Sequence, residues 1–169
     1  MRVLITGGAG FIGSHAANAL FGAGYEVRLL DNLSPQVHGA HRQRPAYLNR
    51  DAELVVGDVT DALAVDRALR GADMVLHLAS AVGVGQSMYD ISSYVRTNEL
   101  GTATLLEAIS KRPVERLVVA SSMSIYGEGL CRSSNCERVI GNCAAVAGNR
   151  SNPSRHPKRS SRRSVRSTH

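Results

Sequence analysis

The chain has 169 residues, which suits one domain, because a chain of this size buries roughly two-thirds of its surface on folding. Residues 1–129 hold 11 Lys and Arg against 13 Asp and Glu, whereas residues 130–169 hold 9 against one acid. The net charge of +6 therefore belongs to residues 130–169 and excludes a basic, nucleic-acid-binding body. No apolar run approaches the roughly 18 residues of a membrane span, and none forms a signal-peptide core. We expect a cytoplasmic protein without a membrane partner.

Five short apolar runs alternate with longer helical patterns in the first part of the chain. Near-continuous apolar runs are typical of parallel strands that are covered on both faces. The five runs are Val3–Thr6, Glu26–Leu30, Glu53–Val56, Met74–Leu78 and Arg116–Ser121. Strands that alternate with helices predict an α/β fold, a Rossmann-type doubly wound parallel sheet with strand order 3-2-1-4-5.

Three helices are predicted between these strands: Ile12–Ala23, which Gly24 ends; Ala62–Leu69, which Asp61 opens; and residues 91–110. The apolar spacing predicts which residues of the first and third helices face the sheet. They are Ile12, Ala16, Ala19, Leu20 and Ala23 in the first, and Ile91, Val95, Leu105, Leu106 and Ile109 in the third. Residues 33–47, which contain two prolines and a glycine, are predicted to form a long surface loop.

Glycines follow the first strand directly, in the pattern Gly7-x-x-Gly10-x-x-Gly13. Glycine suits this place because the chain must turn sharply, approach a pyrophosphate without a Cβ, and pack the next helix closely on the sheet. The N-terminus of that helix offers free N–H groups and partial positive charge to phosphates. A strand before the motif and a helix after it are the context that indicates a dinucleotide site.

Two acids stand where the second and third strands end. Asp31 follows Gly13 by 18 residues, where a carboxylate can accept hydrogen bonds from an adenosine ribose and repel a 2′-phosphate. No Arg follows within ten residues, so the pattern predicts NAD rather than NADP as the cofactor. Asp58 stands where an acid could meet the adenine amino group. Each acid also has a structural alternative: Asp58 could be an ordinary turn residue, and Asp31 could cap a turn.

Two further polar positions are ambiguous on spacing alone. His77 lies inside an apolar run, which favours a hydrogen-bonded interior histidine over an acid–base residue. Ser121, Ser122 and Ser124 follow the fifth strand at the edge where open α/β sheets bind ligands, but serines after a strand are also ordinary turn formers.

These residues together resemble the extended short-chain dehydrogenase/reductase family, in its NAD-dependent sugar-nucleotide epimerase/dehydratase branch, with a UDP-glucose 4-epimerase-like loop at residues 81–87. The resemblance covers residues 1–129. It rests on Thr6–Gly13, Asp31-Asn32-Leu33, Gly57-Asp58-Val59, His77-Leu78-Ala79, Asn98-x-x-Gly101-Thr102 and Ser121-Ser122-x-Ser124-x-Tyr126-Gly127.

The resemblance implies NAD-binding residues in three groups. Those at the pyrophosphate are Gly7, Gly10, Phe11, Ile12 and Gly13. Those at the adenosine are Asp31, Asn32, Asp58 and Val59, and those at the nicotinamide side are Leu78, Ala79, Ser80 and Asn98. It also implies that Ser122 bonds the sugar hydroxyl that is oxidised, that Ser87 contacts a nucleotide-sugar substrate, and that the intact protein forms a homodimer. We expect no metal site.

Catalysis in the resembled family needs a tyrosinate and a lysine four residues later, which lowers the pKa of the tyrosine by its charge. Tyr126 is not that tyrosine, because Leu130 stands four residues after it, and Lys111 and Lys158 are the only lysines of the sequence. We expect the chain as given to be inactive.

Residues 130–169 form a second region that is rich in Ser and Arg and has no hydrophobic period. We expect it to be disordered. Our favoured hypothesis is translation out of frame from about residue 130, which the encoding DNA tests. A zinc element from Cys131, Cys136 and Cys143 is an alternative, but these cysteines lack paired-ligand spacing. The alternative function is a non-catalytic NAD-binding module whose basic tail contacts nucleic acid.

Overall fold

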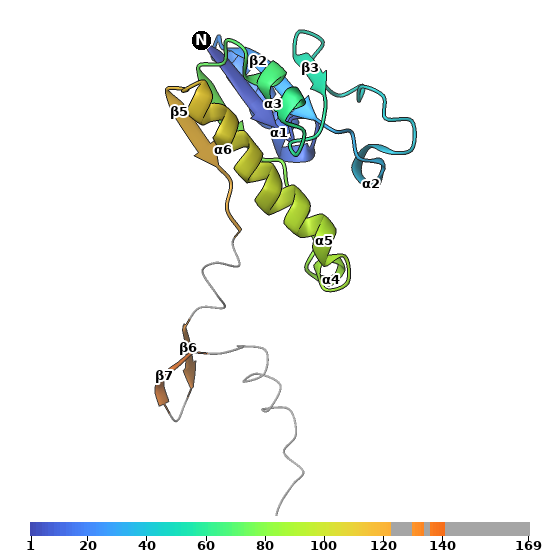
Figure 1. Ribbon diagram of the computed structural model, residues 1–169. Coiled ribbons are helices and arrows are strands. Elements are labelled where there is room, and N and C mark those ends of the chain that lie inside the picture. The colour runs from blue at the N-terminus through green and yellow to red at the C-terminus, as the bar shows by residue number, and fades with distance from the viewer. Residues whose placement is uncertain (123–129, 134–135, 141–169) are drawn as a thin grey trace, which may run out of the picture. The chain divides into compact units, whose positions relative to one another are not determined.

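The computed structural model describes residues 1–122, 130–133 and 136–140, and divides into two units, Met1–Ala120 and Ser121–His169. The first unit holds a five-stranded sheet with helices on both faces (Figure 1). Its strands are β1 (Arg2–Thr6), β2 (Glu26–Asp31), β3 (Glu53–Val56), β4 (Met74–His77) and β5 (Arg116–Val119). All are parallel, in the order β3-β2-β1-β4-β5, which confirms the predicted fold and strand order.

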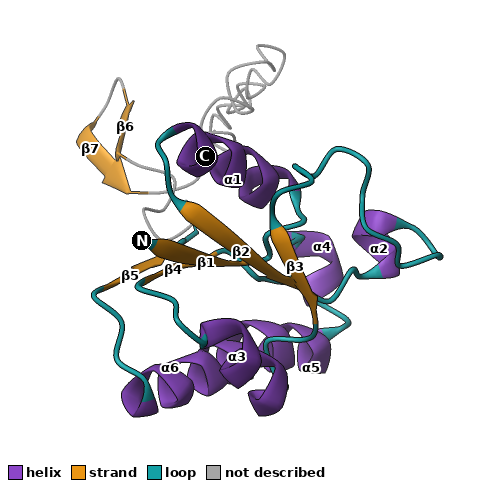
Figure 2. Ribbon diagram, turned by 90° about the horizontal axis from the view of Figure 1, so that it is seen from above, coloured by secondary structure: helices purple, strands orange, loops and turns teal. Residues whose placement is uncertain are grey.

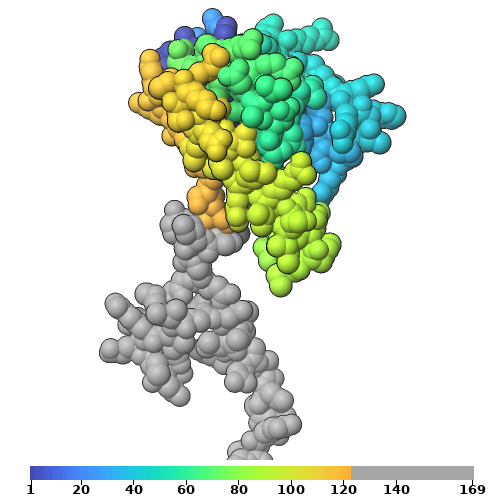
Figure 3. Space-filling view, in the orientation of Figure 1, coloured from blue at the N-terminus to red at the C-terminus, as the bar shows by residue number. Residues whose placement is uncertain are grey.

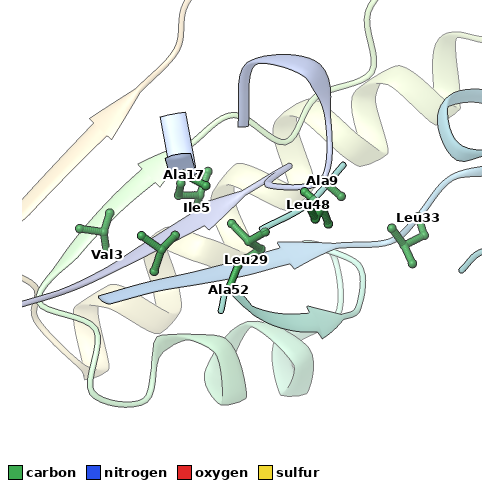
Figure 4. Packing of buried hydrophobic residues seen from close by; sticks show 9 residues of the cluster. Val3, Ile5, Ala9, Ala17, Leu29, Leu33, Leu48 and Ala52 are labelled. Atoms are coloured by element: carbon green, nitrogen blue, oxygen red, sulfur yellow. The ribbon is translucent and has the colours of Figure 1, made fainter. Parts of the chain in front are cut away.

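Helix α1 (Phe11–Gly22) covers one face of this sheet, and α3 (Ala62–Leu69) and α6 (Gly101–Lys111) cover the other (Figure 2). Because successive side chains of a strand point to opposite faces, β1 to β4 contribute side chains to two cores, whereas β5 contributes Leu117 to one. Val3, Ile5 and Leu29 pack with Ala17 beneath α1 (Figure 4), whereas Leu4 packs with the helices on the other face. β1 and β2 carry apolar side chains on both faces because both faces are covered there, whereas Val118 and Val119 of β5 are exposed.

The buried face of α1 differs from the prediction. Gly13, Ser14 and Ala17 are its buried residues, while Ile12 is 66% exposed and Ala19 and Ala23 are exposed. The assignment of Ile12, Ala19 and Ala23 to the sheet side was therefore wrong; Ala16 and Leu20 do pack against the core. For Ile12 the reason is the close approach of the helix to the glycine-rich turn, which admits only small residues such as Gly13 at the first buried positions.

The predicted helix over 91–110 consists of three consecutive pieces, α5 (Ile91–Tyr94), the π-helix η1 (Val95–Leu100) and α6. Leu105 is buried and Ile109 packs against the core as predicted. The inward placement of Ile91, Val95 and Leu106 was wrong, because all three are exposed. The inward side of the first half carries polar residues instead, which bond the loop after β4.

Residues 33–52 are more ordered than a surface loop. They contain the short helix α2 (Pro35–His38), and both Leu33 and Leu48 are buried in the same core as Ala9 of the glycine-rich turn. Another short helix, α4 (Val84–Ser87), follows β4, and the segment around α4 and α5 projects from the first unit in the space-filling view (Figure 3). Among the described residues, no helix is long and apolar enough to cross a bilayer.

In the described part of the second unit lie two antiparallel strands, β6 (Leu130–Ser133) and β7 (Cys136–Ile140). We expected no regular structure after residue 129, and these strands are regular structure within that region. The expected boundary after residue 129 also differs from the division after Ala120. Tyr126, Cys143 and residues 141–169 lie outside the described residues, as do the side chains on which a zinc site would depend, so disorder and zinc binding stay predictions there.

Candidate cofactor-binding site

The glycine-rich turn between β1 and α1 has no room for side chains at two of its predicted positions. Gly7 adopts a φ of +68°, and a Cβ there would lie 2.8 Å from the backbone nitrogen of Ala79. A Cβ on Gly13 would collide with the carbonyl oxygen of Gly7 and lie 2.7 Å from the Cα of Gly8. The first glycine thus allows the turn and the second allows α1 to pack on it.

The start of α1 is open and electropositive. Gly10 is the residue at the N-cap, so no side chain caps the helix, and the first turn carries no acid. Phe11 is 80% exposed, and Ile12 beside it is exposed as well. The backbone N–H groups of a helix start combine with its partial positive charge to favour an anion. This part of the structure therefore fits the pyrophosphate of a dinucleotide.

Asp31 ends β2 and is only 9% exposed. One carboxylate oxygen accepts a hydrogen bond from the backbone N–H of Ala9 over 2.9 Å, and the other accepts one from the N–H of Leu33 over 2.9 Å. The Nε2 atom of His38 lies 3.5 Å from that second oxygen. These contacts fix the carboxylate beside the glycine-rich turn, where the sequence predicted a ribose-binding acid.

Asn32 and Asp58 join the ends of β2 and β3, since the Asn32 side-chain amide donates a hydrogen bond to Asp58 over 2.9 Å. Burial by itself would raise the pKa of the Asp58 carboxyl. Hydrogen bonds from Asn32 and from the N–H and hydroxyl of Thr60, with the positive charge of Arg96, outweigh burial and lower that pKa. Asp58 is therefore an ionised acceptor at the predicted adenine end.

Val59 is placed differently from the other predicted adenosine contacts. Its side chain is buried in the core beneath α6, where it lies against Gly101. A Cβ on Gly101 would come within 2.6 Å of a Val59 methyl group. If Val59 contacts an adenine, only its backbone is available for that contact.

Sequence reasoning missed Tyr47, whose hydroxyl donates a hydrogen bond to the carbonyl of Ala9 over 2.6 Å. The same hydroxyl lies 3.4 Å from Nδ1 of His38. Burial, followed by the negative charge of Asp31, raises the pKa of Tyr47. Tyr47 and Asp31 thus bond the carbonyl and the N–H of one residue of the turn, Ala9.

The loop after β4 carries the residues predicted at the nicotinamide side. The backbone N–H groups of Leu78 and Ala79 both donate to the hydroxyl of Thr6 over 3.2 Å, and Ser80 is exposed beyond them. The side chain of Asn98 pairs with both backbone groups of Ala81, accepting from its N–H over 2.8 Å and donating to its carbonyl over 3.1 Å. Asn98 thus holds the loop that carries the predicted residues.

His77 is confirmed as a hydrogen-bonded interior histidine. It is 4% exposed, and its two ring nitrogens contact the hydroxyls of Thr6 and Thr102. Burial lowers its pKa, which favours the neutral ring. Among the described residues, no group of three or more His, Cys, Asp or Glu side chains is placed to hold a metal ion.

The two predicted substrate residues are Ser87 and Ser122. Ser87 donates its hydroxyl to the carbonyl of Val84 over 2.7 Å, within α4. Ser122 is exposed and belongs to the second unit, so its role as a substrate contact stays a prediction.

The sequence matches the NAD dependent epimerase/dehydratase family over residues 3–139, which extends past the expected boundary at residue 129. The chain belongs to this family. The match covers most of the chain, and it agrees with the strand order and the glycine-rich turn of the first unit.

Known members of the NAD-dependent epimerase/dehydratase family resemble this chain over its first part. A dTDP-L-rhamnose 4-epimerase of Burkholderia thailandensis is 42% identical over 132 residues, which are 76% of this chain and 36% of that protein. A UDP-glucose 4-epimerase of Bacillus subtilis is 37% identical over 129 residues, which are 75% and 38% of the two chains. This chain therefore spans well under half the length of these relatives.

Solved structures show the same fold. The UDP-glucose 4-epimerase of Thermus thermophilus, in complex with NAD, superposes with a TM-score of 0.64 at 40% identity. The match covers 72% of this chain and 38% of that one. Since the family is NAD-dependent, the open glycine-rich turn and the acid at the end of β2 agree with the predicted choice of cofactor.

Proposed function

We propose that this chain is the NAD-binding part of a sugar-nucleotide epimerase/dehydratase. The observation that carries the proposal is the glycine-rich turn, whose Ala9 is hydrogen bonded to Asp31 beside the uncapped start of α1. The start of α1 would bind the pyrophosphate through its N–H groups. Asp31 and Asn32 would bind the adenosine ribose, Asp58 and the Val59 backbone the adenine, and Leu78, Ala79 and Ser80 the nicotinamide side.

NAD is the dinucleotide that this site would select. The Asp31 carboxylate already accepts hydrogen bonds from Ala9 and Leu33, which hold it at the end of β2. A 2′-phosphate would bring a second negative charge to this carboxylate. A calorimetric titration tests the proposal: we expect the chain to bind NAD at least tenfold more tightly than NADP, on the scale of one charge–charge contact. Equal affinity for the two, or binding of neither, would refute it.

The reaction that the site serves would be the oxidation of a sugar hydroxyl on a nucleotide sugar. A bound NAD would supply the acceptor for the hydride of the sugar carbon, and the proton of the hydroxyl would go to a base, which is the tyrosinate in the resembled family. Ser122 would hold the hydroxyl by a hydrogen bond, and Ser87 would contact the substrate. These two roles and the nucleotide-sugar substrate rest on the family; the homodimer and the cytoplasmic location also stay proposals.

The 169 residues alone should not complete that reaction. The sequence contains no Tyr with a Lys four positions later, and a positioned acid–base group contributes about 10²–10⁴ in rate. We expect cofactor binding without turnover of UDP-glucose, measured as conversion to UDP-galactose by chromatography. Turnover at a rate above one per minute would contradict this.

Whether residues 130–169 are read out of frame is decided by the encoding DNA. A Tyr-x-x-x-Lys in another reading frame would support that hypothesis.

The second candidate function is a non-catalytic NAD-binding module with a tail that binds nucleic acid. The observation in its favour is the count of 9 Lys and Arg against one acid in residues 130–169. Binding of this kind weakens steeply with salt, because phosphate contacts release counterions. A labelled duplex titrated at two salt concentrations, with full-length chain and with residues 1–129, separates the two functions. Salt-sensitive binding that needs residues 130–169 favours the module.

A further inference from the structure

A row of hydrogen bonds runs through the interior from the loop after β4 to the π-helix. The Thr6 hydroxyl lies 2.6 Å from Nδ1 of His77, and Nε2 of the same ring lies 3.1 Å from the Thr102 hydroxyl. The Thr102 hydroxyl donates in turn to the carbonyl of Asn98 over 2.5 Å. Thr6 and His77 are both buried, so water does not compete for the bond between them.

The donors and acceptors along this row indicate the direction in which the hydrogen bonds are donated, from Thr6 toward Asn98. The Thr6 hydroxyl oxygen accepts from the backbone N–H of Ala79 and shares the N–H of Leu78 with the Thr6 backbone carbonyl, which leaves its single proton to donate to Nδ1 of His77. Nδ1 is then the acceptor, and the neutral ring carries its proton on Nε2, which donates to Thr102. The Thr102 hydroxyl proton is donated to the backbone carbonyl of Asn98. In this arrangement both ring nitrogens and both threonine hydroxyl protons have a partner.

The two ends of the row hold the two ends of one loop. Thr6 holds the backbone at Leu78 and Ala79, and the side chain of Asn98 holds both backbone groups of Ala81. Asn98 lies in the π-helix η1, and such wide turns often occur at functional sites. Ser80, between the two held points, is exposed and is one of the residues predicted at the nicotinamide side.

We propose that His77 is a positioning residue for the cofactor: its neutral, Nε2-protonated ring ties Thr6 to Thr102 and thereby fixes the loop 78–81 for the nicotinamide half of NAD. This inference rests on the proposed function, because it assigns the loop to that half. The ring would touch neither the cofactor nor the substrate. Its effect passes through the two threonine hydroxyls, so the nicotinamide half of the ligand should sense it more than the adenosine half.

A matched pair of variants tests the Thr6 end. Thr6→Val removes the hydroxyl at nearly constant shape, whereas Thr6→Ser keeps it. We expect Thr6→Val to weaken NAD binding about tenfold, the scale of one lost buried hydrogen bond, and ADP binding less than about twofold. Thr6→Ser should restore the NAD affinity. General damage to the fold would weaken both ligands alike, so equal losses for NAD and ADP would overturn the proposal.

Substitutions of His77 separate the two ends of the row. The Asn side chain can place its oxygen near the position of Nδ1 and accept from Thr6, and the Gln side chain can place its amide near Nε2 and donate to Thr102. His77→Asn and His77→Gln should therefore each retain more NAD affinity than His77→Ala, with ADP affinity alike in all three. No difference among the three variants would contradict the proposal.

The ring itself can be observed in the full-length, ligand-free chain. Nitrogen-15 NMR distinguishes a protonated from an unprotonated ring nitrogen, and we expect the proton of His77 on Nε2 at pH 7.5. A proton on Nδ1, or a charged ring, would overturn the proposal whether or not the chain binds NAD. A chain that shows the Nε2 proton but binds neither NAD nor ADP would refute the proposed function and, with it, the role in positioning NAD.

Discussion

The carboxylate of Asp31 and the backbone N–H of Ala9 are joined by a hydrogen bond of 2.9 Å. This bond connects the end of β2 to the glycine-rich turn, although the two residues lie 22 positions apart. The acid predicted to bind the ribose and the turn predicted to bind the pyrophosphate are thus one rigid feature. A dinucleotide would meet both in a fixed relation, with little of the ordering that a flexible site must undergo on binding.

Replacing this acid should therefore affect both stability and cofactor choice. In Asp31→Asn one carboxylate oxygen becomes an N–H₂ group, which faces a backbone N–H and leaves it without an acceptor. We expect a loss of about 1–3 kcal/mol in the free energy of unfolding, measured with urea, and a smaller preference for NAD over NADP. Asp51→Asn, on an exposed loop, is the matched control and should change neither. An unchanged preference in Asp31→Asn would argue against the assigned role.

Two glycines of α1 offer a second test. Gly13→Ala places a Cβ against backbone atoms of the turn, which cannot move aside as a flexible side chain can. We expect it to destabilise the fold by about 1–3 kcal/mol and to abolish measurable NAD binding. Gly22→Ala, in the same helix, meets nothing within 4 Å and should change stability by between zero and about 1 kcal/mol in the favourable direction. Full NAD binding by Gly13→Ala would be incompatible with the proposed site.

The contact of Tyr47 with the glycine-rich turn gives a third test. Tyr47→Phe removes the hydroxyl that donates to the Ala9 carbonyl and leaves that carbonyl short of a donor. We expect a loss of about 1 kcal/mol in unfolding free energy, together with faster amide exchange in residues 33–48. Tyr89→Phe, at an exposed tyrosine, is the control. Equal exchange rates in the two variants would show that Tyr47 does not hold this segment.

The buried ring of His77 should make stability depend on pH. Its folded-state pKa lies below the value of about 6.5 for an unfolded chain, so the unfolded state takes up a proton first as the pH falls. Stability is therefore fully present above about pH 6.5 and declines below it until the folded-state pKa is reached. Urea unfolding between pH 7.5 and 5.5 measures this. We expect the decline in unfolding free energy to disappear in His77→Gln and to persist in His41→Gln, whose histidine is exposed. A decline that persists in His77→Gln and disappears in His41→Gln would exclude His77 as its cause.

The sequence predicted the sheet and the glycine-rich turn because there the local pattern and the tertiary contacts agree. β1 reads as a strand because Val3, Leu4 and Ile5 are apolar, and both of its faces are covered. Gly7 and Gly13 were identified because only glycine suits a sharp turn that packs so closely. Asp31 was found from its position after β2, but its bond to Ala9 was not, since spacing does not show what a carboxylate faces.

The long helical region shows where such reasoning fails. A search for apolar spacing placed Ile91 and Val95 toward the sheet, yet they are exposed. The inward side there bears Tyr94, Asn98 and Thr102, which bond the backbone after β4 or the ring of His77. An interior face that is polar because it holds a loop cannot be told from a solvent face by hydropathy. Tyr47 was missed for a related reason, because a segment with prolines and no period predicts only a loop.

The one-way row of bonds through His77 has a consequence for motion. The ring lies between two threonine hydroxyls, with its Nε2 proton on the side of Thr102, and we expect water to replace Thr102 only when α6 or the loop after β4 moves away. Its exchange with solvent deuterium would then proceed no faster than that opening. The exchange rate of this one proton would thus report how often the loop 78–81 separates from the helix that holds it.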